Sequence, residues 1–427
     1  AFQHSSIPAF QHSRPTLFPF PASPDPSAPM EPPGIRTLQL LNALVGAGLY
    51  LSFPLAIETW SRMGWSLSQI GWAMAGSNLC YAAIVGLGGR LSDGWGRART
   101  ALLGAGICML AALIALGSGS AFGALIGTML GCAGSAIFFP GNVGLFSDAR
   151  DVSGERAQPL HLKVSHYNLG WSGGNVVGFG LAWCFVLLPA QVGWATIVLF
   201  MSVILFTLWR WRSLPARPPL ADGDRAPHPA LPQLTWIGRG SLLIYCMMGM
   251  AFISLLEPAL KQQGQSGLAA HHGYTVACFG YAVGYFVMFI VLGRWGGWVL
   301  QPWRLLAAQI PIMVAALGVV SLAHSEAPSE LILFMLALLL GVGFAAVYTG
   351  SIYYSLRLPH GAAQAAARHE TALGIGSTIG PALCGLFMSH VGGGALASLG
   401  LWMVIIAASV MVLQATQIPR AIRAGAS

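Results

Sequence analysis

The chain has 427 residues, of which 55% are hydrophobic and only 8% are charged, with a formal net charge of +8. A water-soluble protein carries roughly 25% charged residues, so this composition excludes an ordinary soluble domain and indicates that lipid is the main solvent. The positive charge does not indicate nucleic-acid binding, because the basic residues are scattered through short segments rather than gathered in one patch. The seven cysteines lie in apolar runs without metal-ligand or redox spacing.

Residues 1–36 are rich in Pro and Ser and contain two near-copies of one segment, Ala1–Ser5 and Ala9–Ser13. They lack the charged and apolar regions of a signal peptide. Because such a segment cannot bury enough apolar surface to fold, we expect a disordered N-terminal tail.

Apolar runs of about 20 residues, the length that crosses the hydrocarbon core as a helix, recur from residue 37 onward. We therefore predict an all-α membrane protein with twelve transmembrane helices. The predicted spans are 37–57, 69–89, 99–118, 121–147, 163–186, 192–211, 239–258, 273–295, 303–323, 330–356, 366–389 and 394–416.

Lys and Arg fall almost entirely on one side of these spans. With the N-terminus in the cytoplasm, only Arg62 and Lys261 of the 21 basic residues face outward, as expected where positive loops stay inside. The Pro-rich, charged segment 211–236 separates six helices from six and is typical of a cytoplasmic linker. We predict an integral protein of the bacterial inner membrane with both termini in the cytoplasm. Its parts are an N-terminal bundle 37–211, a linker 212–238, a C-terminal bundle 239–416 and a tail 417–427.

The two predicted bundles resemble each other in sequence. Gly174–Gly178 in the fifth span matches Gly376–Gly380 in the eleventh, and Glu58 near the end of the first span has a counterpart in Glu257 of the seventh. These matches indicate a six-helix unit used twice, an architecture of many secondary transporters.

Charged residues crowd the segment between the second and third spans, Gly89–Ala101. Three arginines and an aspartate cannot lie in hydrocarbon, so we expect a tight loop there. Gly89 and Gly96 allow close approach of the backbone, and Asp93 is suited to the N-terminus of a neighbouring helix.

This segment fits the pattern G-x-L-[A/S]-D-x-x-G-R-[K/R]-x-x-L, with Ala98 at the second basic position. The chain thereby resembles the major facilitator superfamily over roughly residues 37–416. The resemblance implies two pseudo-symmetric six-helix bundles that rock around a central site. It also implies that Asp93 latches onto the start of the eleventh helix and that Arg97 pairs with Asp148, below the fourth. The alternative is that these charges only stop helices and set topology.

Two departures from the family pattern argue against proton-coupled drug antiport. Gly127 stands where proton-driven members often carry an arginine in the fourth helix, and Phe179 replaces the proline of the fifth.

Polar and aromatic residues near the middle of several spans predict a mostly neutral cavity with a few fixed hydrogen bonds. The alternative for each residue is that it bonds helices together. The absence of Arg and Lys at this depth argues against a strongly anionic substrate. The cavity candidates are Asn78, Asn142, Trp171, Asn175, Tyr285, Tyr348 and Ser377.

Three acids within or at the ends of spans are candidates for proton coupling, because burying a carboxylate is costly. Glu257, in an apolar setting before Pro258, is the first choice, and a water-exposed position near the membrane surface is the alternative for it and for Glu58. Glu370, near the start of the eleventh span, is either a loop-facing charge or a gate residue.

No enzyme motif or nucleotide-binding loop is present in the sequence, and we expect neither a cofactor nor a metal. The predicted function is transport of a small neutral or amphipathic molecule by a monomer, either facilitative or driven by an ion gradient, with protons among the candidate coupling ions. A proton-coupled efflux antiporter and a non-transporting sensor on the same fold are the alternatives.

Overall fold

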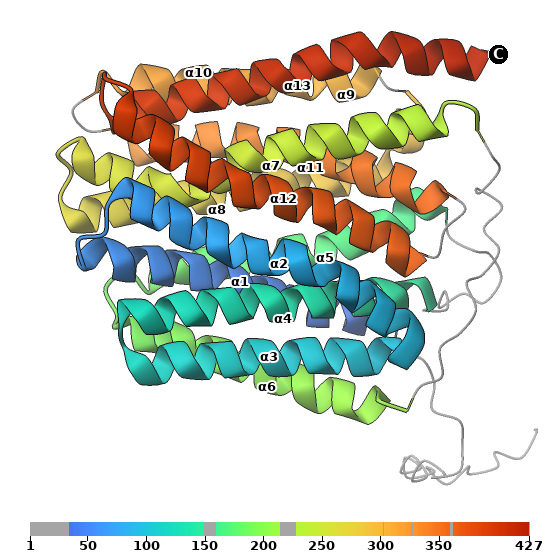
Figure 1. The fold of residues 1–427 in the computed structure, drawn as a ribbon, viewed down its shortest axis with the longest axis horizontal. Coiled ribbons are helices and arrows are strands. Elements are labelled where there is room, and N and C mark those ends of the chain that lie inside the picture. The colour runs from blue at the N-terminus through green and yellow to red at the C-terminus, as the bar shows by residue number, and fades with distance from the viewer. Residues whose placement is uncertain are drawn as a thin grey trace, which may run out of the picture. The chain divides into compact units, whose positions relative to one another are not determined.

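The computed structural model describes residues 34–426 except 149–158, 214–227, 302, 326–327 and 359–361. The described residues form helices and connections only, which confirms the all-α prediction (Figure 1). The helices are α1 (Ile35–Arg62), α2 (Leu67–Trp95), α3 (Arg97–Ser118), α4 (Ala121–Asp148), α5 (Leu160–Cys184), α6 (Ala190–Trp211), α7 (Leu231–Gln262), α8 (Gly267–Arg294), the short 3-10 helix η2 (Gly296–Trp298), α9 (Trp303–Ala307), α10 (Gln309–Leu322), α11 (Glu330–Arg357), α12 (Ala362–His390) and α13 (Ala395–Ala426).

Ten helices of the described chain are long and apolar enough to cross a membrane. The other two predicted spans are covered by α5, whose first turns carry several polar residues, and by the pair α9 and α10. Pro311 explains the break between α9 and α10, because proline has no N–H to bond the carbonyl of Ala307, four residues earlier. The twelve expected spans are therefore all helical, one of them interrupted.

Several predicted boundaries were wrong. The expected loop at 89–101 is reduced to Gly96, which joins α2 to α3 with a φ of 109°, a value suited to glycine. Asp93 consequently lies in the last turn of α2. Helix α7 begins at Leu231 rather than 239, and α13 continues through the predicted tail, because Ile418 and Ala421 are buried against the core.

The sequence repeat corresponds to a repeated packing contact. A side chain at Gly174 or Gly178 of α5 would meet backbone carbonyl oxygens of α1 at 2.0 and 2.6 Å. Likewise, a side chain at Gly376 or Gly380 of α12 would meet carbonyl oxygens of α7, both at 2.1 Å. We call these two contacts the glycine seams, and each one allows two helix backbones to touch.

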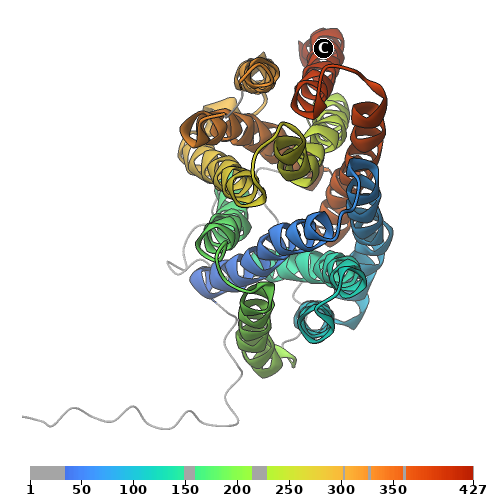
Figure 2. The ribbon, with the colours of Figure 1, turned by 90° about the vertical axis from the view of Figure 1, so that its left-hand side faces the viewer.

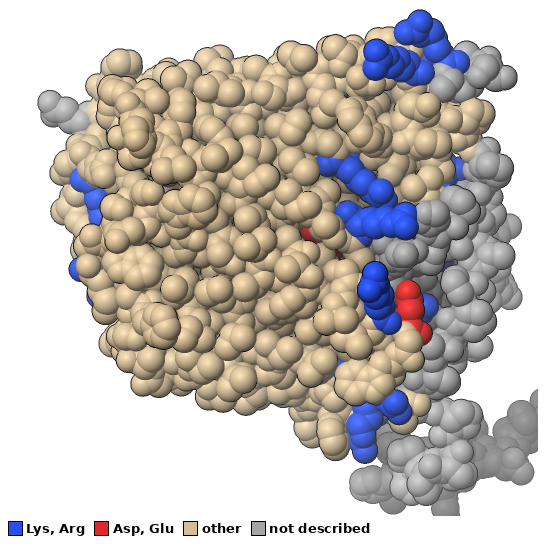
Figure 3. Space-filling model, in the orientation of Figure 1, with Lys and Arg blue, Asp and Glu red and all other residues tan. Residues whose placement is uncertain are grey.

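Helices α1–α6, here the first half, and α7–α13, the second half, meet mainly where α2 packs on α12 and α5 on α8 (Figures 1 and 2). On the face shown in Figure 3, Lys and Arg gather near the two ends of the helices, and the broad area between them is almost free of charge. Such an uncharged band is expected where helices face lipid.

Candidate functional site

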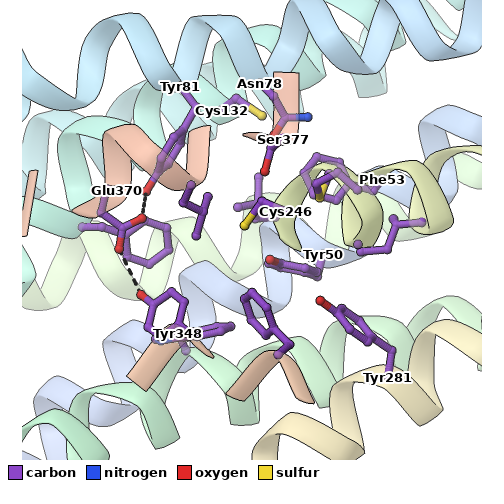
Figure 4. A pocket seen from close by; sticks show the side chains of 18 of the residues that line it. Tyr50, Phe53, Asn78, Tyr81, Cys132, Cys246, Tyr281, Tyr348, Glu370 and Ser377 are labelled. Atoms are coloured by element: carbon purple, nitrogen blue, oxygen red, sulfur yellow. Dashed lines mark hydrogen bonds between the residues drawn. The ribbon is translucent and has the colours of Figure 1, made fainter. Parts of the chain in front are cut away.

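A cavity of about 80 Å³ lies between the two halves, room for several waters or a small molecule. Helices α1, α2, α4 and α5 of the first half and α7, α8, α11 and α12 of the second contribute to its wall (Figure 4). Nine lining residues are aromatic: Tyr50, Phe53, Tyr81, Phe139, Tyr167, Trp171, Tyr281, Phe344 and Tyr348. The remaining ones are Leu49, Asn78, Cys132, Cys246, Gly249, Met250, Ile253, Glu370, Leu373 and Ser377.

Glu370 is the one carboxylate among these lining residues, and it is only 4% exposed. The hydroxyl of Tyr81 donates to its Oε2 at 2.7 Å, and that of Tyr348 donates to its Oε1 at 3.0 Å (Figure 4). Tyr81 belongs to α2, whereas Tyr348 and Glu370 belong to α11 and α12, so the carboxylate joins the two halves. Among the described residues, no Lys or Arg lies within ion-pair distance of Glu370.

Aromatic contacts also cross from one half to the other. The ring of Trp171 in α5 lies 5.1 Å from that of Tyr348 in α11 and 5.5 Å from that of Tyr285 in α8. One turn earlier, the Asn168 amide donates to the hydroxyl of Thr349 at 3.4 Å. Trp171 therefore occupies the contact between the halves at the edge of the cavity.

Four of the seven predicted cavity residues line this cavity, namely Asn78, Trp171, Tyr348 and Ser377. The other three are buried outside its lining: Asn142 in α4, Asn175 in α5 and Tyr285 in α8. Tyr285 packs on Trp171 and so supports the wall from behind.

A second polar cluster joins the halves at the ends of α1 and α7, near their turns to α2 and α8. We call Glu58, Ser61, Glu257, Lys261 and His271 the outer cluster, after the face on which the predicted topology would place it. Lys261 Nζ donates to Glu257 Oε1 and to Ser61 Oγ, both at 2.7 Å. His271 Nδ1 lies 2.9 Å from Glu257 Oε2, and its Nε2 lies 3.8 Å from Glu58 Oε2. Contacts from the second half thus reach Ser61 and Glu58 of the first.

Glu257 is fully buried but not in the apolar setting expected from its sequence neighbours, because Lys261 and His271 both contact its carboxylate. Glu58 is also buried and pairs with Arg62 on the same helix at 2.5 Å.

The amino-acid sequence matches the Major Facilitator Superfamily over residues 38–381. The chain belongs to the major facilitator superfamily. The fold is similar to a solved structure described as a Major Facilitator Superfamily transporter, FucP, in the outward conformation, with a TM-score of 0.60 and 14% sequence identity over 90% of this chain and 98% of that one. No curated protein matched the sequence.

Within the segment that carries the family pattern, Arg97 connects α3 to α4. Arg97 is buried, and its Nη1 donates to the carbonyl oxygen of Gly144 in α4 at 2.8 Å. A side chain at position 144 would meet the Arg97 side chain at 2.6 Å, so glycine leaves the space that the arginine fills. Gly89 is buried in α2, and Asp93 is exposed on the same helix. Asp148 ends α4, and its side chain lies outside the described residues.

Sequence reasoning missed Tyr81 and His271 as site residues. Tyr81 lies three residues after Asn78, so both occupy one face of α2, and this spacing was the available signal. His271 lies just before the predicted span 273–295, whereas its partner Glu257 was already a candidate on another helix. A contact between two helices that are distant in the sequence leaves no pattern among the neighbouring residues, so it could not be predicted.

Proposed function

We propose that this membrane transporter carries a small neutral or amphipathic organic molecule by alternating access of its central cavity. The supporting observation is the cavity itself, which is mostly aromatic and is built by both halves. Ligand sites of this kind combine apolar walls with a few placed polar groups. A site between two halves is also where relative rotation changes access from one face to the other.

A ligand that fills the cavity should stabilise the purified protein, because binding to the folded state alone raises its stability. A thermal-shift screen against metabolites and drugs, followed by flux measurements in proteoliposomes, tests this proposal. Gly249→Leu would fill the cavity and should abolish the shift. Gly76→Leu is the matched control, since nothing lies within 4 Å of a side chain placed there. Stabilisation without flux would favour the sensor alternative.

We propose proton coupling as a second candidate property, and Glu370 supports it better than Glu257 or Glu58. Glu257 has Lys261 within hydrogen-bond distance, and Glu58 has Arg62. Glu370 has tyrosine hydroxyls instead. Glu370→Gln should remove proton-driven accumulation while exchange of a neutral substrate persists. Unchanged accumulation in that variant would contradict this assignment.

We also propose that the protein works as a monomer in a bacterial inner membrane, with the ends of α1 and α13 that adjoin the chain termini on the cytoplasmic side. The asymmetry of Lys and Arg in the sequence supports this orientation. The six-helix halves, joined between α6 and α7, are the proposed moving bodies.

A further inference from the structure

Glu370 is a buried carboxylate, and the other described residues that line its cavity are of uncharged types. Its two hydrogen-bond donors are tyrosine hydroxyls, and among the described residues neither Lys nor Arg lies within ion-pair distance. Buried charges in proteins are normally paired with an opposite charge, since an isolated ion is costly to remove from water. Within the described part of the chain, the carboxylate therefore has no positive partner, and a ligand can supply one.

The walls around this carboxylate suit a positive group for a second reason. Aromatic residues approach from both halves, including Tyr50 and Trp171 from the first and Tyr281 and Phe344 from the second. The faces of aromatic rings carry partial negative charge and attract organic cations, more strongly where water is excluded. A cavity of mixed aliphatic residues would provide no such attraction.

Two residues that line the cavity also have a backbone carbonyl group without its usual helical donor. Pro54 in α1 and Pro381 in α12 lie four residues after Tyr50 and Ser377, both of which line the cavity. A proline inside a helix removes the hydrogen bond to the carbonyl oxygen four residues earlier. The carbonyl groups of Tyr50 and Ser377 thus lose that helical N–H donor, and this source of acceptors is independent of Glu370.

We propose that the cavity binds an organic monocation, an ammonium group attached to an apolar or aromatic body, with the ammonium at Glu370. This inference rests on the proposed transport function and narrows its substrate to an amphipathic molecule that carries a positive charge. An anion would be repelled by the carboxylate, and a neutral ligand would leave it unpaired. A proton on Glu370 is the competing occupant, and it predicts that neutral ligands bind as well as cations do.

A set of matched probes separates these cases. We would titrate the purified protein at pH 7.5 with 4-phenylbutylamine, 4-phenylbutan-1-ol and 4-phenylbutanoate by isothermal titration calorimetry. Both the ammonium and the alcohol can donate a hydrogen bond to the Glu370 carboxylate, but only the ammonium adds the attraction of a full positive charge. The ammonium should therefore bind at least about tenfold more tightly than the alcohol, a difference of about 1.4 kcal/mol. The anion should bind most weakly.

Three variants assign the preference to Glu370. Glu370→Gln should remove the difference between ammonium and alcohol, whereas Glu370→Asp should retain part of it. Glu330→Gln is the control, because Glu330 lies exposed at the start of α11, outside the cavity lining. Size-exclusion chromatography checks that each variant is folded.

Equal binding of ammonium and alcohol to the wild type would overturn the substrate class and leave the proposed cavity intact. Binding of none of the probes would also overturn it, and the thermal-shift screen would then test transport separately. Retention of the ammonium preference in Glu370→Gln would place the cation elsewhere and overturn the assignment.

Discussion

Replacing Lys261 by Met should shift the protein toward the conformation that is open at the outer cluster. The side chain keeps nearly the same length and loses its charge. Two contacts disappear: the ion pair with Glu257, which lies within α7, and the hydrogen bond to Ser61, which joins α7 to α1. Only the second contact differs between a closed and an open arrangement of the halves.

The size of the shift follows from that crossing contact, because an equilibrium moves only by the difference in stabilisation between its two states. A hydrogen bond with one charged partner contributes roughly 1.5–3 kcal/mol. The Lys261 side chain is 23% exposed, which favours the lower value. A loss of about 1.5 kcal/mol corresponds to a roughly tenfold increase in the open population.

The labelling rate of a cysteine in the outer part of the cavity measures this population. Phe53→Cys is suitable, because Phe53 lines the cavity and lies on α1 between Tyr50 and the outer cluster. An impermeant maleimide would be added to cells in a background where the cavity cysteines and the exposed one are replaced by Ser, namely Cys132, Cys246 and Cys184. Labelling should become about tenfold faster in Lys261→Met, because the rate is proportional to the open population.

Two further variants control this experiment. Ser61→Ala removes the same crossing bond and should act in the same direction. Arg62→Met should have little effect, because its contact with Glu58 lies within α1 and its side chain is 67% exposed. The reasoning is refuted by an unchanged rate in Lys261→Met, or by an equal increase in Arg62→Met.

Three other outcomes are expected. Gly376→Val should prevent folding, since its side chain would meet a carbonyl oxygen of α7 at 2.1 Å, whereas Gly76→Val should yield a monodisperse peak in size-exclusion chromatography. Asp93→Asn should lower the transport rate in proteoliposomes while membrane insertion is kept, and a wild-type rate would reduce the residue to a topology signal. In intact cells, an impermeant thiol reagent should label Leu268→Cys, which replaces an exposed residue near the outer cluster, and should fail to label Asp222→Cys; labelling of the latter would reverse the topology.

Most of the fold was predictable from two sequence patterns. The length of the apolar runs predicts which segments cross the lipid, and the spacing of the glycines predicts where two helices pack closely. The matched glycines of α5 and α12 correspond to equivalent seams. The helix ends were less predictable: Trp60 extends α1 beyond residue 57, because its side chain is buried and its indole donates to the Ala121 carbonyl at the start of α4. Such tertiary contacts leave no trace in local composition.

The cavity shows the same limit. Asn78 and Ser377 were recognisable as polar residues in apolar runs, and both line it. Glu370 was expected at a loop or gate, since it lies close to a helix start, and its contact with Tyr81 joins residues 289 apart in the chain. The position of a residue along a predicted helix indicates its depth in the membrane, but it does not indicate which other helix the side chain will contact.

The seam between α1 and α5 has a consequence for biosynthesis. Asn42 of α1 is fully buried, and its amide donates to the carbonyl oxygen of Tyr167 at 3.0 Å, 125 residues further along the chain. At a translation rate of about 5–20 residues per second, α5 leaves the ribosome roughly 6–25 s after α1. During that delay, the Asn42 amide of α1 has no Tyr167 carbonyl to bond. Lipid headgroups, water at the membrane surface or the insertion machinery must then satisfy this amide to keep α1 in the membrane.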